Sequence, residues 1–333
     1  MINVYQDHVA NTGSRDYPGN ISGEDEDWTL DTFKKNFDID ISFLTDNEAN
    51  FDLKGIDTSL ANAFRRIMIA EVPSVAIDSV FIEMNTSVIQ DEVLASRIGL
   101  VPLRLSPDWL DWVDPTQEAV DENGESQLNN SRNTVIFSLN VKCERNKNAP
   151  AGSEDPNELY INSNVYARDL KFQPQEGQLE FMDPPPTVAS PDILLCKLRP
   201  GQEISLYCFA VLGVGSDHAK FSPVSTASYR LMPSITLTED ITGEEAEKLK
   251  KCFSPGVIDI KNNKAVVVDP RRDTVSREVL RHPEFRDKVQ LGRVRNHFIF
   301  NVESTGAMEP DEIFVKSINQ LRNKAKDLLA CEL

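Results

Sequence analysis

One narrow apolar stripe along the closing segment, residues 309–330, limits the fold more than any other feature of the chain. Its members recur at spacings of four, three, four and three residues: Phe314, Ile318, Leu321, Ala325 and Leu328. Pro310 suits the first turn of a helix, and Asp311 favours the positive end of the helix dipole. The pattern predicts one long helix of roughly 33 Å.

A stripe with two apolar positions per heptad is narrower than most core-facing helices show, and it is typical of helix–helix seams. Burying each such side chain is worth about 1.5–3 kcal/mol, so on the order of 10 kcal/mol depends on this stripe. Two interpretations stay open at this point. The stripe packs on the chain's own sheet, or it faces a second chain.

A second helix is predicted between two strand patterns near the start of the chain. Asp57-Thr58-Ser59 offers an N-cap, and Leu60, Phe64 and Ile67 follow at helical spacing. Pro73 disfavours a helical conformation at the residue before it, so this helix should end near Glu71.

Most of the remaining chain has the pattern of strands joined by polar loops. Apolar alternation or short apolar runs predict strands over residues 37–43, 50–54, 75–83, 135–141, 165–172, 193–198, 204–210 and 296–302. We expect the strand over 37–43 to be half-buried. The strands over 193–198 and 204–210 flank a turn-type sequence and predict a hairpin. With a short helix over 244–252, the fold class is α+β, and the polar residues 1–36 are expected to form a mobile acidic tail.

Charge and hydropathy exclude several classes of protein. The formal net charge of −18 opposes a broad phosphate-binding surface, because nucleic-acid affinity comes mostly from Lys and Arg that displace counterions. Acidic residues gather in the tail and in the loop 107–125, whereas 271–295 carries eight basic and four acidic residues. That basic run is either a solvated face or a functional surface. No run approaches the about 18 apolar residues of a membrane span, and residues 1–16 lack the layout of a signal peptide.

Cysteine spacing and motif searches predict neither a metal site nor a catalytic centre. The five cysteines are widely spaced and are expected to be reduced thiols: Cys143, Cys196, Cys208, Cys252 and Cys331. No H-E-x-x-H, G-x-S-x-G or phosphate-loop motif occurs. Asp217 and His218 are neighbours that point apart on most backbones, with no nucleophile nearby. We therefore predict no catalytic residue and no cofactor.

Three sequence blocks resemble the α-like subunits of cellular RNA polymerases. Residues 56–78, which include Leu60-Ala-Asn-Ala-Phe-Arg-Arg-Ile-Met-Ile, look like the α motif with its arginine pair. Asp91-Glu-Val-Leu-Ala-Ser-Arg-Ile-Gly-Leu-Val-Pro-Leu resembles the signature of eukaryotic and archaeal α-like chains. His218-Ala-Lys-Phe-Ser-Pro-Val resembles their loop between two domains.

Within this family the chain resembles the branch shared by RNA polymerases I and III. The third-largest subunit of RNA polymerase II, and some archaeal relatives, carry a cysteine cluster soon after the second block. Here that span is the cysteine-free acidic loop. The run from Val275 to Ser304 also looks like the shared branch. The alternatives are the polymerase II or archaeal subunit, or a free-standing α+β enzyme.

The resemblance implies a fold and a set of contacts. A discontinuous dimerisation domain would combine residues 37–78 and 226–333, with an inserted, mainly β domain at 79–225. The implied seam with a smaller α-like partner comprises Leu60, Phe64, Ile67, Phe314, Ile318, Leu321, Ala325 and Leu328. Implied contacts with the second-largest subunit, or with small zinc-binding subunits, are Arg65, Arg66, His218, Lys220 and Phe221. The implied role is non-catalytic assembly in the nucleus and nucleolus, for transcription of ribosomal, transfer and other small RNAs.

Overall fold

A computed structural model describes residues 2–10, 29–113, 130–150 and 154–331. Its α-helices are α1 (Leu30–Asn36), α2 (Thr58–Ala70), α3 (Asp91–Gly99), α4 (Pro156–Leu159), α5 (Gln178–Phe181), α6 (Gly243–Lys251) and α7 (Pro310–Ala330). Its 3-10 helices are η1 (Pro107–Trp109), η2 (Ala167–Asp169), η3 (Ala219–Phe221), η4 (Pro270–Arg272), η5 (Glu278–Arg281) and η6 (Pro283–Phe285). The described part of the acidic loop, residues 107–113, contains η1, and residues 114–129 lie outside the described residues.

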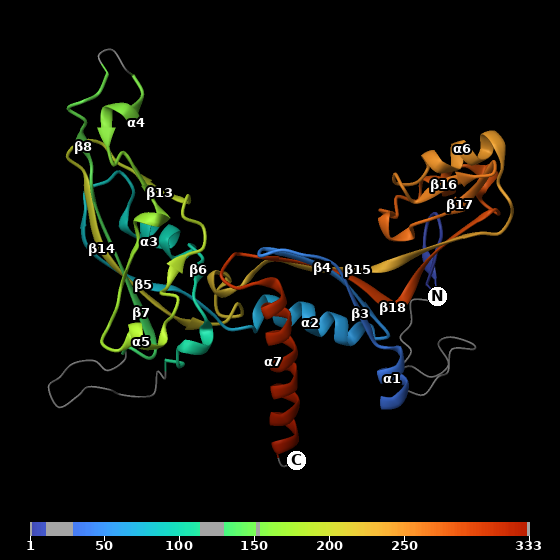
Figure 1. The fold of residues 1–333 in the computed structure, drawn as a ribbon, viewed down its shortest axis with the longest axis horizontal. Coiled ribbons are helices and arrows are strands. Elements are labelled where there is room, and N and C mark those ends of the chain that lie inside the picture. Colours follow the sequence, from blue (N-terminus) through green and yellow to red (C-terminus); the bar gives the residue numbers. More distant parts are fainter. Residues whose placement is uncertain (1, 11–28, 114–129, 151–153, 332–333) are drawn as a thin grey trace. The chain divides into compact units, whose positions relative to one another are not determined.

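The chain forms two compact units from interleaved segments (Figure 1). Unit 1 is drawn from residues 1–43, 49–65 and 228–301, and unit 2 from 44–48, 66–227 and 302–333. The domain boundaries expected from the sequence stay a prediction. Within the expected tail, the described residues form β1 (Ile2–Val4), β2 (Val9–Ala10) and α1.

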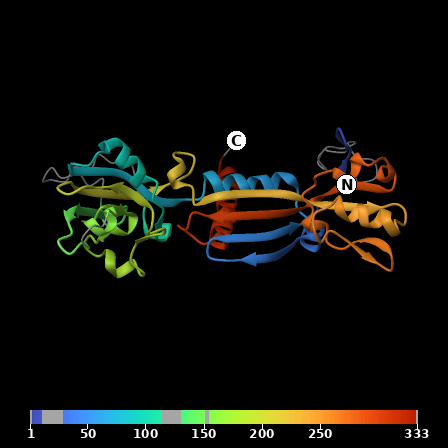
Figure 2. The ribbon, with the colours of Figure 1, turned by 90° about the horizontal axis from the view of Figure 1, so that it is seen from above.

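The main sheet of unit 1 has the strand order β2-β1-β18-β4-β3, with β15 also paired to β18. Its remaining strands are β3 (Asp38–Leu44), β4 (Glu48–Lys54), β15 (Val224–Leu237) and β18 (Val289–Ser304). Figure 2 shows β15, β18, β4 and β3 side by side, with α2 along the sheet. Phe51 of β4 stacks on Phe300 of β18, with ring centroids 5.4 Å apart, so aromatic packing joins these neighbouring strands.

A small lobe of unit 1 surrounds α6 and the hairpin of β16 (Ile258–Lys261) and β17 (Lys264–Val267). Ala246 and Leu249 of α6 are buried in its core, together with Phe285 of η6. The short helix expected over 244–252 is therefore present, and its apolar side is the side that packs.

Unit 2 is built on an antiparallel sheet with the strand order β11-β7-β14-β5. Its strands are β5 (Ser74–Asn85), β7 (Thr134–Lys142), β11 (Lys171–Gln173) and β14 (Glu203–Gly213). The smaller pairs are β6 (Leu103–Arg104) with β12 (Thr187–Val188), β8 (Glu144–Arg145) with β9 (Tyr160–Ile161), and β10 (Asn164–Tyr166) with β13 (Leu194–Lys197). Leu94 and Ile98 of α3 are buried in the core beside Phe137, Leu206 and Cys208.

The hairpin predicted over 193–198 and 204–210 is wrong. The turn itself forms, because the Gln202 N–H donates to the Arg199 carbonyl at 2.9 Å. However, β13 pairs with β10, whereas β14 lies between β5 and β7. The strand predicted over 165–172 is likewise interrupted by η2, so its two ends join different sheets.

The five cysteines are free thiols, four of them buried and Cys331 exposed. Burial raises the pKa of the Cys208 thiol to about 12, so this thiol stays protonated at neutral pH. Across the described residues no helix is both long and apolar enough to cross a membrane.

Candidate functional site

The apolar stripe of α7 is most exposed at the end of the helix. Phe314 and Leu321 are half-buried, Ile318 is 40% exposed, Ala325 is exposed and Leu328 is 74% exposed. The residues of α7 that this chain does bury are Pro310, Ile313 and Ser317. The described chain therefore packs the first turns of α7 and leaves the stripe open.

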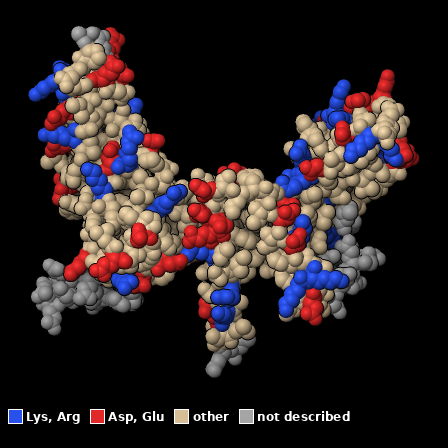
Figure 3. Space-filling view, in the orientation of Figure 1, with Lys and Arg blue, Asp and Glu red and all other residues tan. Residues whose placement is uncertain are grey.

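Two ion pairs fix α7 within unit 2. The Lys316 ammonium lies 2.7 Å from the Asp108 carboxylate, and that of Lys324 lies 2.8 Å from Glu71. Figure 3 shows Lys and Arg atoms gathered on the distal half of the helix. These contacts orient the helix from its polar side, which leaves the apolar stripe available to another surface.

The predicted seam residues of α2 are more covered than those of α7. Leu60 and Phe64 are half-buried, and Ile67 is buried at 3% exposure. Arg65 donates to the Asn62 side-chain oxygen at 2.9 Å, and Arg66 is exposed. The arginine pair thus has one member held on the helix and one directed to solvent.

The expectation of a half-buried strand over 37–43 is wrong, because every residue of β3 is exposed. Lys54 of β4 forms ion pairs with Asp38 and Asp40, which places these three side chains on one face of the sheet. Side chains alternate along a strand, so Ile39 and Ile41 belong to the opposite face, and they are 42% and 60% exposed. β3 ends the sheet, and Ile39 and Ile41 on its apolar side stay exposed in the described chain. Exposed apolar side chains on an edge strand favour association with another surface.

The loop that follows β14 brings His218, Lys220 and Phe221 together on η3. His218 is exposed and its Nδ1 accepts the Lys220 N–H at 3.1 Å, so it serves as a cap. The Lys220 ammonium lies 2.8 Å from the Asp78 carboxylate. Phe221 is 5% exposed, and its ring packs against Gly213. His218 therefore lies at the surface, whereas the buried Phe221 side chain anchors the loop.

Replacing Gly215 by Ala is expected to destabilise unit 2 by about 1–3 kcal/mol, as overpacking does. A Cβ at this position would lie 2.2 Å from the Ile69 carbonyl oxygen, which is backbone and can move only with α2. Thermal denaturation measures the effect. Gly99→Ala is the control, since its Cβ would lie 3.4 Å from the Ile77 carbonyl oxygen and should be tolerated. Equal melting temperatures for the two variants would contradict the close approach.

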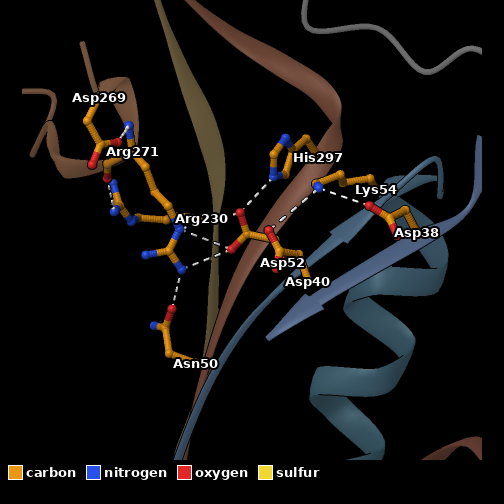
Figure 4. A network of polar contacts seen from close by, with 9 residues as sticks. All are labelled: Asp38, Asp40, Asn50, Asp52, Lys54, Arg230, Asp269, Arg271 and His297. Atoms are coloured by element: carbon orange, nitrogen blue, oxygen red, sulfur yellow. Dashed lines mark hydrogen bonds and ion pairs between the residues drawn. The ribbon is translucent and has the colours of Figure 1, made fainter. Parts of the chain in front are cut away.

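A buried polar network, missed by the sequence reasoning, ties η4 to the main sheet of unit 1 (Figure 4). Asp52 is 4% exposed, and its carboxylate accepts three hydrogen bonds from Arg271, the shortest at 2.9 Å. His297 Nε2 lies 2.9 Å from the same carboxylate. Burial raises the pKa of the Asp52 carboxyl, but bonds from Arg271 and His297 outweigh burial and hold that pKa below its usual range.

Two further groups complete this network. Arg271 also donates to the Asn50 side chain, and Arg230 donates to the carbonyl oxygens of Arg271 and Asp273. Burial lowers the pKa of the Arg230 guanidinium. The arrangement is a clamp between distant segments. Within the described residues, no three His, Cys, Asp or Glu side chains are placed to hold a metal ion.

Comparison with known proteins decides what kind of chain carries these surfaces. Residues 50–325 match the family described as the RNA polymerase Rpb3/Rpb11 dimerisation domain. The chain belongs to this family. The match confirms the resemblance to α-like polymerase subunits and the α+β fold class.

Curated relatives extend along nearly the whole chain. The DNA-directed RNA polymerases I and III subunit RPAC1 of Saccharomyces cerevisiae is 58% identical over 100% of this chain and 98% of the relative. The subunit of the same name from Homo sapiens is 45% identical over 96% of this chain and 92% of the relative. The DNA-directed RNA polymerases II, IV and V subunit 3 of Arabidopsis thaliana is 33% identical over 88% of this chain and 90% of the relative.

Proposed function

We propose that this chain is the larger α-like subunit shared by RNA polymerases I and III. The observation that carries the proposal is the identity to relatives that bear this name, 58% and 45%, against 33% for a subunit named for polymerases II, IV and V. In this role the chain acts in the nucleus and nucleolus as a part of the polymerase.

The chain acts by pairing with a smaller α-like subunit. Two uncovered apolar surfaces support this role. In unit 2 the α7 stripe includes Ile318 and Leu328, both exposed. In unit 1 the apolar side of β3 includes Ile39 and Ile41, also exposed. Covering each surface with a partner removes apolar area from water, which stabilises the heterodimer.

The second-largest polymerase subunit, and the small zinc-binding subunits, contact the polar surfaces. Arg66 and His218 are exposed and present a guanidinium and an imidazole to such neighbours. A guanidinium pairs with carboxylates or carbonyl oxygens through its planar fork. Arg65 and Lys220 contribute through the remaining donors of side chains that are already held by Asn62 and Asp78.

The chain itself takes no part in the chemistry of the polymerase. His218 is engaged as a cap for η3, and Asp52 is engaged in the clamp with Arg271. Both are polar contacts that stabilise the fold. Assembly is therefore the proposed contribution of this subunit, which joins its smaller partner and then the larger subunits.

Affinity purification of the tagged full-length chain tests this function. We expect the largest subunits of polymerases I and III to co-purify, together with one smaller α-like chain, and mass spectrometry identifies them. Recovery of the polymerase II largest subunit instead would assign the chain to the other branch. A chain recovered without any polymerase subunit would overturn the proposal.

A further inference from the structure

A pocket of unit 2 is not used by the proposed assembly role. It is a cavity of about 460 Å³ lined by the segment before α3, the last turn of α3, β13 and the turn that precedes β14. Figure 1 shows α3 and β13 next to each other in this unit. Leu195 and Cys196, both buried, are among the lining residues, and Val88, another of them, has 86% of its surface exposed. The volume lies in the range of about 300–1,000 Å³ that is usual for ligand pockets.

The pocket carries positive charge in a strongly acidic chain. Arg97, Lys197 and Arg199 line it, and no Asp or Glu does. Among the described residues, none of these three cations forms an ion pair with a carboxylate of the chain. The local charge thus opposes the net charge of −18. A cluster of cations around an apolar lining attracts a ligand that is both anionic and apolar.

Backbone contacts fix two of these cations in place. Arg97 Nε donates to the Leu195 carbonyl at 3.0 Å, and its Nη2 donates to the Leu194 carbonyl at 2.6 Å. Arg199 Nη1 donates to the Leu198 carbonyl at 3.1 Å. A guanidinium has five N–H donors, so both side chains keep donors for a carboxylate. Because they are already oriented, less side-chain entropy is lost when a ligand binds.

We propose that this pocket binds a short acidic segment of a partner protein, inserting one large apolar side chain between carboxylates that contact Arg97, Lys197 and Arg199. The segment's apolar side chain covers Val88 and the lining beside Leu195. Its carboxylates pair with the three cations. This binding is separate from the α7 and β3 surfaces, and it does not depend on which polymerase the chain joins.

Titration of the full-length chain with a fluorescein-labelled octapeptide tests the proposal, with anisotropy as the readout. The peptide alternates Asp or Glu with Leu or Phe, and a second peptide carries Asn and Gln at the acidic positions. We expect the acidic peptide to bind saturably and to weaken as salt screens its charges. Equal binding of the neutral peptide, or the absence of saturable binding by the acidic one, would overturn the proposal.

The double variant Lys197→Glu/Arg199→Glu should weaken binding about tenfold, because each exposed ion pair contributes a factor of a few. Lys171→Glu/Arg145→Glu is the matched control, since both residues are exposed in unit 2 and outside the pocket lining. The control should stay within about twofold of the original chain. If the double variant does not fold, Lys197→Glu alone takes its place, because the Lys197 ammonium makes no hydrogen bond within the described residues. Thermal melts show whether each variant is folded. An equal loss of peptide affinity in the control would assign the effect to net charge and would contradict the proposal.

Discussion

Replacing Ile318 and Leu321 by Asp is expected to abolish pairing with the smaller α-like subunit while leaving the chain folded. Ile318 is 40% exposed and Leu321 half-buried in the single chain, so Asp at either position retains access to water there. In a covered seam the same carboxylates would lie unpaired among apolar side chains, which costs several kcal/mol. We expect the dissociation constant to rise by at least about 100-fold, or about 2.7 kcal/mol.

Co-expression followed by light scattering and calorimetry measures this loss of pairing. Asn319→Asp/Asn323→Asp is the matched control, because it adds the same two charges at two exposed positions of α7 that lie off the stripe. The control should pair as the original chain does. Undiminished pairing of the double Asp variant would place the seam away from the α7 stripe.

Local periodicity was enough to predict the elements that carry the proposed interface. The spacing of Leu60, Phe64 and Ile67 predicted a helix that the structure places at Thr58–Ala70. The stripe from Phe314 to Leu328 predicted α7, which spans Pro310–Ala330. Both predictions succeed because a helix places residues three and four apart on one side, whatever lies beyond it.

Periodicity could not say which apolar face is covered by this chain and which is left for a partner. The alternation of Phe37, Ile39 and Ile41 correctly marks a strand, but it is the same whether the apolar side meets a core or another protein. The exposed side of β3 therefore appears only in three dimensions. The family resemblance supplied the partner that the pattern alone leaves open.

Pairing between segments that lie far apart in the sequence could not be predicted from local patterns either. The turn at Arg199–Gln202 suggested a hairpin, yet β13 and β14 enter different sheets, and no local feature encodes that choice. Likewise, Asp52 and Arg271 lie 219 residues apart in the sequence. The alternation along β4 marks Asp52 as a solvent-facing residue, and only the packing of η4 over it makes it buried.

Replacing Asp52 by Asn is expected to destabilise the chain by about 2–4 kcal/mol at neutral pH, because breaking a buried ion pair leaves a charge without its counterion. The Arg271 side chain is 30% exposed and the Asp52 side chain 6%, so water only partly compensates. Asp38→Asn is the control. Asp38 is 61% exposed in its pair with Lys54, so its loss should cost less than about 1 kcal/mol. Urea denaturation measures both variants, and equal effects would refute the buried clamp.

The destabilisation caused by Asp52→Asn should diminish in acid. The pKa of the Asp52 carboxyl is lowered in the folded chain from its ordinary value of 3.8, with burial opposing and the bonds from Arg271 and His297 producing the decrease. A depressed pKa contributes stability that is fully present above the unfolded value and is lost as the pH falls through the folded value. The difference in unfolding free energy between Asp52→Asn and the original chain should thus shrink as the pH falls below about 4. A difference that instead grows as the pH falls below about 4 would mean that the carboxyl is protonated in the fold, and the clamp would then rest on Arg271 and Asn50.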